Sequence, residues 1–315
     1  MNKNLKQNIL QGVKQLEGQT ISLDNALDNM KFIDESKRLA REHEWLFHCT
    51  TDMALISILK NRELWLSNLK LVNDKEEAAR VDVPEYEKTY YVSCFTYDPQ
   101  IPKEHWIEYG NVENGVLIGV KPTWIKREAT FMNDGNQKCE DEFWRILKNQ
   151  DEALKYKAEQ QLKRRITNPY YINAFGFYQI IYDDTIVKTI KGNGGIEING
   201  ELIPGRTLTP AIAGIIKSTQ GMCQRWGKEP YMKDWTSEKE VRLKVGIQQF
   251  DIFKNGFENH DGMIVQNAFF PKVAIPVSEK AFDEIKIKFS PNFQNKEEYL
   301  EKLRKIVPDS TIEVI

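Results

Sequence analysis

Two glutamates and an arginine at alternate positions, Glu238, Glu240 and Arg242, form the group of residues with the clearest chemical potential. They overlap a segment, 240–245, whose alternation of polar and apolar residues predicts a β-strand. Because alternate side chains of a strand point to one face, two carboxylates and a guanidinium would lie in one row. Such a row is either a functional site or a solvated strand face with weak cross-strand ion pairs.

A single histidine, His48, is the next candidate. The apolar run 45–47 predicts a short buried strand that ends on His48. Thr50 and the two residues after it are N-cap types, and apolar residues then recur at helical spacing through 55–59. Free N–H groups at a helix N-terminus favour anions such as phosphate. His48 therefore either binds a ligand at a strand-to-helix turn, or it caps or packs.

A polar cluster, Asn73, Asp74 and Glu77, opens another predicted helix. The preferred interpretation is a helix cap with acidic residues in the first turn, where the helix dipole favours them. The alternative is a divalent-cation site completed by His48 or Glu240, which would suit a nuclease or phosphodiesterase.

Three aromatic residues, Trp106, Tyr109 and Trp235, lie beside predicted strands and could stack on a nucleobase or a nicotinamide ring. Aromatic residues in such places more often belong to the core. We expect Trp106 to be a core residue.

The composition is that of an ordinary globular protein of 315 residues with a formal net charge of -2, which gives no general attraction to nucleic acid or acidic membranes. The four cysteines form no CxxC pair, and the four histidines form no HxxxH or HExxH pair, so we expect no disulfide framework and no metal. No signal peptide and no apolar run of membrane-spanning length occurs, which predicts a cytoplasmic protein without a membrane partner.

Strands and helices alternate along the chain without strict βαβ periodicity, which predicts an α+β fold with a mixed or antiparallel sheet and flanking helices. We expect a helical N-terminal extension over 1–44 and a main domain over 45–315. Within the main domain we expect a helical insertion at about 140–168 and a hairpin and helix insertion at about 185–226. Strands are predicted at 64–69, 90–96, 115–120, 174–182, 240–245, 285–289 and 311–315, an Asn-Gly hairpin at 196–203, and helices at 105–110, 209–226 and 297–306.

Several of these segments, taken in order, resemble a bacterial domain-of-unknown-function family. The matching elements are His48-Cys49-Thr50, Leu64-Trp65-Leu66-Ser67, Asn73-Asp74-x-x-Glu77, Val92-Ser93-Cys94-Phe95-Thr96, Trp106-x-x-Tyr109-Gly110 and Trp235-x-x-Glu238-x-Glu240-x-Arg242. The chain departs from the family at Cys49, where an aromatic residue is usual, at Thr96, where serine is usual, and in an enlarged region around 185–225.

More distantly, the histidine of the first strand, the helix after it and the late Glu-x-Glu strand are similar to ADP-ribosyltransferases, including toxins that modify nucleic acid. The resemblance implies an ADP-ribosyltransferase-like fold with NAD as substrate. It assigns His48 and Thr50 to NAD and Ser93 or Tyr109 to the nicotinamide side. It makes Glu240 the catalytic carboxylate and Glu238 an acceptor-side helper, and Arg242, beside them, has no firm counterpart.

We consider three functions. The first is an ADP-ribosyltransferase-like enzyme of a toxin or phage-defence system, with a protein, RNA or DNA acceptor. The second is a non-catalytic sensor that binds a nucleotide, a phage protein or another defence-system protein. The third is a metal-dependent nuclease built on Asp74, Glu77 and Glu240.

Overall fold

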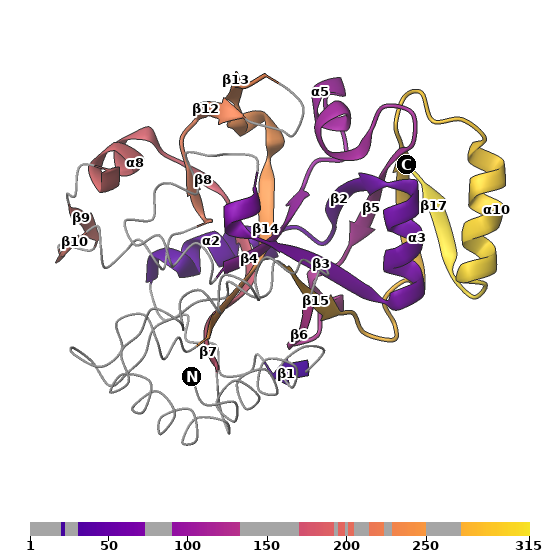
Figure 1. Ribbon diagram of the computed structural model, residues 1–315, viewed down its shortest axis with the longest axis horizontal. Helices are drawn as coiled ribbons and strands as arrows, with labels where there is room; N and C mark the ends of the chain where they lie inside the picture. The colour runs from indigo at the N-terminus through magenta and orange to yellow at the C-terminus, as the bar shows by residue number, and fades with distance from the viewer. Residues whose placement is uncertain are drawn as a thin grey trace, which may run out of the picture.

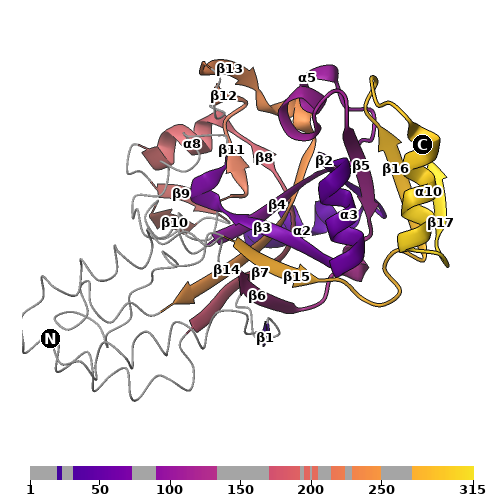
Figure 2. The same ribbon diagram turned by 45° about the vertical axis from the view of Figure 1, so that its right-hand side comes forward.

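The computed structural model describes residues 20–22, 31–72, 90–132, 170–191, 195–198, 201–204, 214–223, 229–249 and 272–315. An open, mostly antiparallel sheet of eleven strands forms its centre, with helices beside it (Figures 1 and 2). The mixed α+β class predicted from the sequence is thereby confirmed.

The first half of the described chain contains β1 (Thr20–Ser22), α2 (Lys31–Arg41), β2 (Leu46–Thr51), α3 (Asp52–Asn61), β3 (Glu63–Asn68), η1 (Leu69–Leu71), β4 (Tyr90–Thr96), α5 (Lys103–His105), the π-helix η3 (Trp106–Gly110), β5 (Gly115–Val120), η4 (Pro122–Trp124) and β6 (Glu128–Met132). The second half contains β7 (Tyr170–Gln179), β8 (Ile181–Tyr182), α8 (Asp184–Lys191), β9 (Gly195–Ile198), β10 (Glu201–Pro204), β11 (Ile216–Lys217), β12 (Gln220–Cys223), β13 (Tyr231–Asp234), η5 (Trp235–Glu238), β14 (Glu240–Gln249), β15 (Lys272–Pro276), β16 (Glu284–Phe289), α10 (Lys296–Ile306) and β17 (Thr311–Val314).

The sheet divides at its central strand, β4. Along one edge, β14 pairs with β4 over the whole length of β4. Two strands share the other edge of β4. β3 pairs with Tyr91 and Val92 of β4, and β2 pairs with Thr96 of β4. Between these contacts, residues 93–95 have no strand neighbour on this edge within the described part of the chain. The arms β3–β15–β6–β1 and β2–β5–β16–β17 therefore diverge from β4 as a fork.

The core lies on one face of this sheet and follows the alternation of β14. Val241, Leu243 and Val245 are fully buried among apolar side chains, while Arg242 and Lys244 point to the opposite face. Burying such apolar side chains supplies the main driving force of folding. The strand thus holds its charged residues in a row on the non-core face.

Helix α3 covers the core beside β2 and begins at a threonine cap. The Thr51 side chain accepts a hydrogen bond from the Ala54 N–H at 3.3 Å, and Arg62 ends the helix in the left-handed conformation. Helix α10 packs beside α3, as both views show (Figures 1 and 2). The Tyr299 hydroxyl joins the two by donating to the carbonyl of Asp52 at 2.7 Å.

Most of the predicted strands are confirmed with small changes of boundary. They include β3, β4, β5, β14, β16, β17 and the β9–β10 hairpin, and the helix α10 is confirmed as well. The predicted helices at 73–77 and 140–168 lie outside the described residues.

Three local predictions are wrong. The first strand does not end on His48 but continues to Thr51, because Thr50 and Thr51 pair with residues 116 and 115 of β5. Residues 214–223 are not helical but form a turn and the strands β11 and β12, which pair with β8 and β13; the helix of this region is α8. The extension before Trp45 contains the helix α2, as predicted, but it is not helical throughout, because β1 pairs with β6 and joins the sheet.

Candidate functional site

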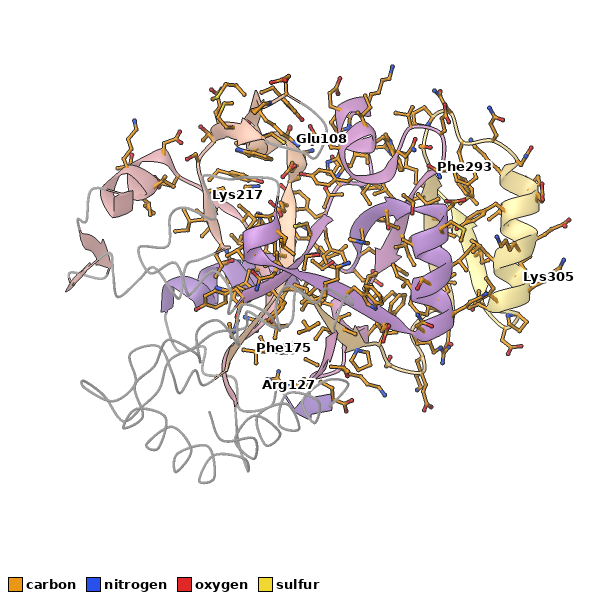
Figure 3. All side chains as sticks on the ribbon, in the orientation of Figure 1. Glu108, Arg127, Phe175, Lys217, Phe293 and Lys305 are labelled. Atoms are coloured by element: carbon orange, nitrogen blue, oxygen red, sulfur yellow. The ribbon has the colours of Figure 1, made fainter. Side chains whose placement is uncertain are left out.

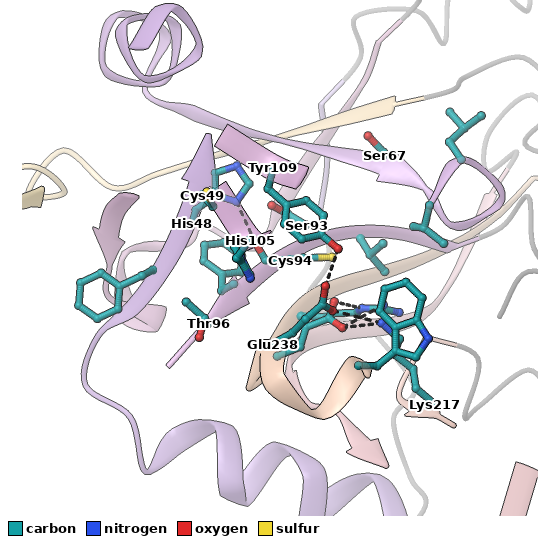
Figure 4. A pocket seen from close by; sticks show the side chains of 18 of the residues that line it. His48, Cys49, Ser67, Ser93, Cys94, Thr96, His105, Tyr109, Lys217 and Glu238 are labelled. Carbon is teal, nitrogen blue, oxygen red and sulfur yellow. Dashed lines mark hydrogen bonds and ion pairs between the residues drawn. The ribbon is translucent and has the colours of Figure 1, made fainter. Parts of the chain in front are cut away.

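A pocket of about 250 Å³ opens where the sheet forks. The open stretch of β4 forms its floor, β2 and β3 form two sides, and η3, η5, β11 and β14 complete it. Figure 4 shows His48 and Cys49 on one side of this pocket and Glu238 and Lys217 on the other, with Tyr109 between them. Residues far apart in the chain therefore meet in one place.

Glu240 forms one wall of the pocket together with two cations. It accepts hydrogen bonds from Arg242, at 2.6 Å from Nε and 3.2 Å from Nη2, and from the Lys217 ammonium at 3.1 Å. Glu240 and Arg242 are only 4% and 2% exposed. The row of charged residues predicted from the sequence is therefore a buried ion-pair cluster, and the interpretation as a solvated strand face is wrong.

Glu238 joins this cluster from a different element. It lies in η5, which Asp234 caps by accepting from the Thr236 N–H at 2.9 Å, and not on β14 as predicted. Its carboxylate accepts from the Tyr109 hydroxyl at 2.5 Å, and it pairs with Lys233 at 2.7 Å and Lys217 at 3.4 Å. Lys217 thus bridges the two glutamates.

A third carboxylate, Glu108, extends the cluster toward the β12–β13 hairpin. It accepts hydrogen bonds from Lys233 and from the Tyr231 hydroxyl. Glu108 and Lys217 lie at the same end of the molecule (Figure 3). The three carboxylates are thereby matched by three cations, Lys217, Lys233 and Arg242, so that the charges balance without a ligand.

Both pocket glutamates are ionised at neutral pH. Burial raises the pKa of Glu240, but the Arg242 guanidinium and the Lys217 ammonium outweigh this and hold that pKa well below its usual range. Burial acts on Glu238 in the same way, and Lys217 and Lys233 lower the pKa of Glu238 in turn. Burial and the Glu238 charge raise the pKa of Tyr109, so its hydroxyl stays protonated and donates.

His48 sits in the middle of β2 and faces the fork. Its Nδ1 lies 2.8 Å from the Cys94 carbonyl, which only accepts, so Nδ1 carries the proton. Burial lowers the pKa of His48, which keeps the ring neutral at neutral pH. Its Nε2 is then an acceptor that makes no hydrogen bond to a described residue. A neutral ring away from the helix N-terminus does not supply the anion site that the sequence suggested.

Unused hydrogen-bonding groups also line the pocket. The buried Ser93 Oγ and the buried Trp235 Nε1 have no hydrogen-bond partner among the described residues. The Cys94 N–H leaves β4 on the same side as its carbonyl and therefore faces the fork. Buried polar groups are rarely left unpaired in proteins, so these atoms are suited to a polar ligand.

The π-helix η3 carries Tyr109 into the site through a close approach to β2 and β5. A Cβ on Gly110 would lie 3.1 Å from Cys49 Sγ, and a Cβ on Gly115 would lie 2.3 Å from the Asn111 carbonyl oxygen. Trp106, the predicted core residue of this segment, is buried against Phe47 and Leu117. π-Helical turns occur frequently at functional sites.

Most of the residues proposed from the sequence line this pocket. They are His48, Ser93, Tyr109, Trp235, Glu238, Glu240 and Arg242. Thr50 is buried and does not line it, and Asn73, Asp74 and Glu77 lie outside the described residues. Sequence reasoning missed Lys217, Lys233, Glu108 and His105, because each is an isolated charged or titratable residue and carries no spacing signal.

Among the described residues, no group of three or more His, Cys, Asp or Glu side chains is arranged to bind a metal ion. A cation at Glu238 or Glu240 would also have to displace Lys217.

Comparisons with protein-family models, with curated proteins and with solved structures find no match. In the described part of the chain, no helix is long and apolar enough to span a membrane.

Proposed function

We propose that the chain is an ADP-ribosyltransferase-like enzyme that binds NAD in the fork pocket and transfers ADP-ribose to a macromolecule. One observation carries the proposal: the sheet forks at β4 and brings His48 of β2 into the same pocket as Glu238 and Glu240. A cleft between these groups is what the resemblance to ADP-ribosyltransferases implies. The same resemblance suggests an ADP-ribosyltransferase-like fold and a toxin or phage-defence setting.

The charge arrangement suits the chemistry of this reaction. Cleavage of the nicotinamide–ribose bond leaves the electron pair on nicotinamide and develops positive charge on the sugar. Two ionised carboxylates, held in place before the reaction, stabilise such a charge electrostatically. Glu238 and Glu240 are fixed in this way by Lys217, Lys233 and Arg242.

The polar atoms of the opposite wall suit the rest of the substrate. The neutral His48 ring offers Nε2 as an acceptor, which fits a ribose hydroxyl better than a phosphate. The Ser93 hydroxyl and the Cys94 N–H offer partners for a carboxamide or a hydroxyl. His48 is thus assigned to sugar recognition.

The test is binding of NAD, measured by calorimetry and by thermal shift. A ligand at about 100 times its dissociation constant stabilises the folded state by about 2.7 kcal/mol, so millimolar NAD raises the Tm of the wild type. His48→Ala removes one acceptor and weakens NAD binding by roughly threefold to tenfold, as expected for one hydrogen bond.

The control for this experiment is His43→Ala. His43 stacks on Tyr97 and contacts Gln179, and it does not line the pocket. Its loss leaves NAD affinity unchanged. No Tm shift of the wild type across millimolar NAD would contradict the proposal.

A second candidate function is a non-catalytic sensor that binds a nucleotide or a protein. The observation that favours it is the full pairing of the glutamates, whose oxygens already accept from Lys217, Lys233, Arg242 and Tyr109. Release of nicotinamide from bound NAD separates the two candidates. A transferase cleaves the nicotinamide–ribose bond, releases nicotinamide and passes ADP-ribose to water or to an acceptor, whereas a sensor binds NAD and leaves it intact.

A further inference from the structure

An exposed tryptophan at the mouth of the pocket has no role in the core. Trp65 lies on β3 between Leu64 and Leu66, which are both buried, and its own side chain points to the other face. It is 46% exposed and lines the pocket. Because it lines the pocket, this exposed ring offers a flat apolar surface on which a ligand can stack.

Neighbouring side chains hold this ring in place. The Trp65 Nε1–H donates to the Glu63 carboxylate at 2.7 Å, and the Lys272 ammonium lies 5.2 Å from the ring centroid. An anchored ring loses little side-chain entropy when a ligand stacks on it. The indole therefore presents a fixed flat surface.

The surroundings of Trp65 match a nucleotide. Leu71 and Val72 line the same pocket and add apolar surface, and Leu71 is exposed. Lys272 adds positive charge beside the ring, which suits a phosphate attached to a base. Planar bases stack on aromatic side chains with little regard to their identity.

We infer that Trp65 is a stacking platform for a nucleobase at the mouth of the fork pocket. This inference deepens the proposed function, because NAD carries an adenine in addition to its nicotinamide. The same surface accepts a base from a single-stranded nucleic-acid acceptor. The shared chemistry is a planar heteroaromatic base next to a phosphate, and the two sources are separated by experiment.

The experiment measures the affinity of wild type, Trp65→Ala and Trp65→Phe for three probes: NAD, nicotinamide mononucleotide, and a short single-stranded oligonucleotide. If the adenine of NAD stacks on the indole, Trp65→Ala weakens NAD binding by about tenfold to a hundredfold. The same variant has an unchanged affinity for nicotinamide mononucleotide, because this probe has no adenine. Trp65→Phe keeps a ring and retains most of the NAD affinity.

The control variant is Met53→Ala, which removes an exposed apolar side chain on α3 that does not line the pocket. If Trp65→Ala weakens the binding of the oligonucleotide and not that of NAD, the indole stacks on a base of the acceptor. Equal losses for NAD and nicotinamide mononucleotide, or no loss for any probe, overturn the inference. If the wild type does not bind NAD, the proposed function fails and the oligonucleotide alone decides the role of Trp65. Binding of none of the three probes overturns both.

Discussion

Arg242 is the residue on which the buried charges of the site depend most directly. Its guanidinium is 2% exposed, grips Glu240 with two nitrogens and also donates to the Gly214 carbonyl at 3.3 Å. A planar guanidinium suits such a geometry better than an ammonium does. The residue therefore positions the carboxylate as well as neutralising it.

Replacing Arg242 by Met should leave Glu240 without its main partner in a buried environment. Breaking a buried pair from one side costs about 3–5 kcal/mol, and we expect a loss of that size in the free energy of unfolding, measured by urea denaturation. The free energy of unfolding of Arg242→Lys should lie between those of Arg242→Met and the wild type.

The matched control is Lys239→Ala, which breaks the exposed pair between Lys239 and Asp98 at 2.5 Å. An exposed pair contributes about 0–1 kcal/mol. If Arg242→Met destabilises the protein no more than Lys239→Ala does, the buried cluster does not have the energetic role assigned to it.

The sequence identified the acidic and basic residues at the centre of this cluster, but it did not predict all of their partners or their burial. The spacing of Glu238, Glu240 and Arg242 predicted that they act together, and they do lie together. Lys217 could not be predicted, because its two-residue strand β11 is defined only by pairing with β8. The burial of the row was not predictable either, since alternation describes a strand equally well whether its polar face meets water or other charges.

The tight approach of η3 to β5 positions Tyr109, and it depends on Gly115. A Cβ there would lie 2.3 Å from a backbone oxygen, which cannot move without displacing the turn. Gly115→Ala should therefore destabilise the protein by about 1–3 kcal/mol, as overpacking does. It should also shift Tyr109 away from Glu238 and reduce the Tm shift that NAD produces.

Glu113→Ala is the control for this prediction, because Glu113 is exposed in the same turn. A Gly115→Ala protein with wild-type stability and a wild-type response to NAD would show that the close approach is not required. The sequence predicted a helix at 105–110, where this element lies. The π-helical turn itself was not predictable, because it arises from the packing of Trp106 and Gly110 on β2 and β5.

The whole molecule should lose stability in two stages as the pH falls. Burial lowers the folded-state pKa of His48 and His105 below the usual 6.5, so their contribution is present above about pH 6.5 and is lost as the pH falls from there through the lower folded-state pKa. Glu238 and Glu240 also have lowered pKa values, so their contribution persists above about pH 4.5 and is lost below it.

Urea denaturation between about pH 8 and about pH 2 measures this profile through the free energy of unfolding. The double variant His48→Gln, His105→Gln should lose the first stage and retain the second. An unchanged profile in the double variant would show that these buried histidines do not govern the loss between about pH 7 and pH 5.

Across the fold, the sequence predicted the strands and helices better than their arrangement. Strands such as β4, β5 and β14 were recognisable because apolar and β-branched residues alternate within each of them. The fork was not recognisable, because it depends on which strands share the two edges of β4. Those partners lie far away in sequence, at residues 47, 67–68 and 240–246.

This arrangement has a consequence for protein synthesis. At about 5–20 residues per second, a ribosome needs on the order of ten seconds to proceed from β4 to β14. During that interval the nascent chain holds His48 and the β4 edge but neither pocket glutamate. The chain therefore acquires its buried charges late, and any chemistry that depends on them begins only after most of the polypeptide has left the ribosome.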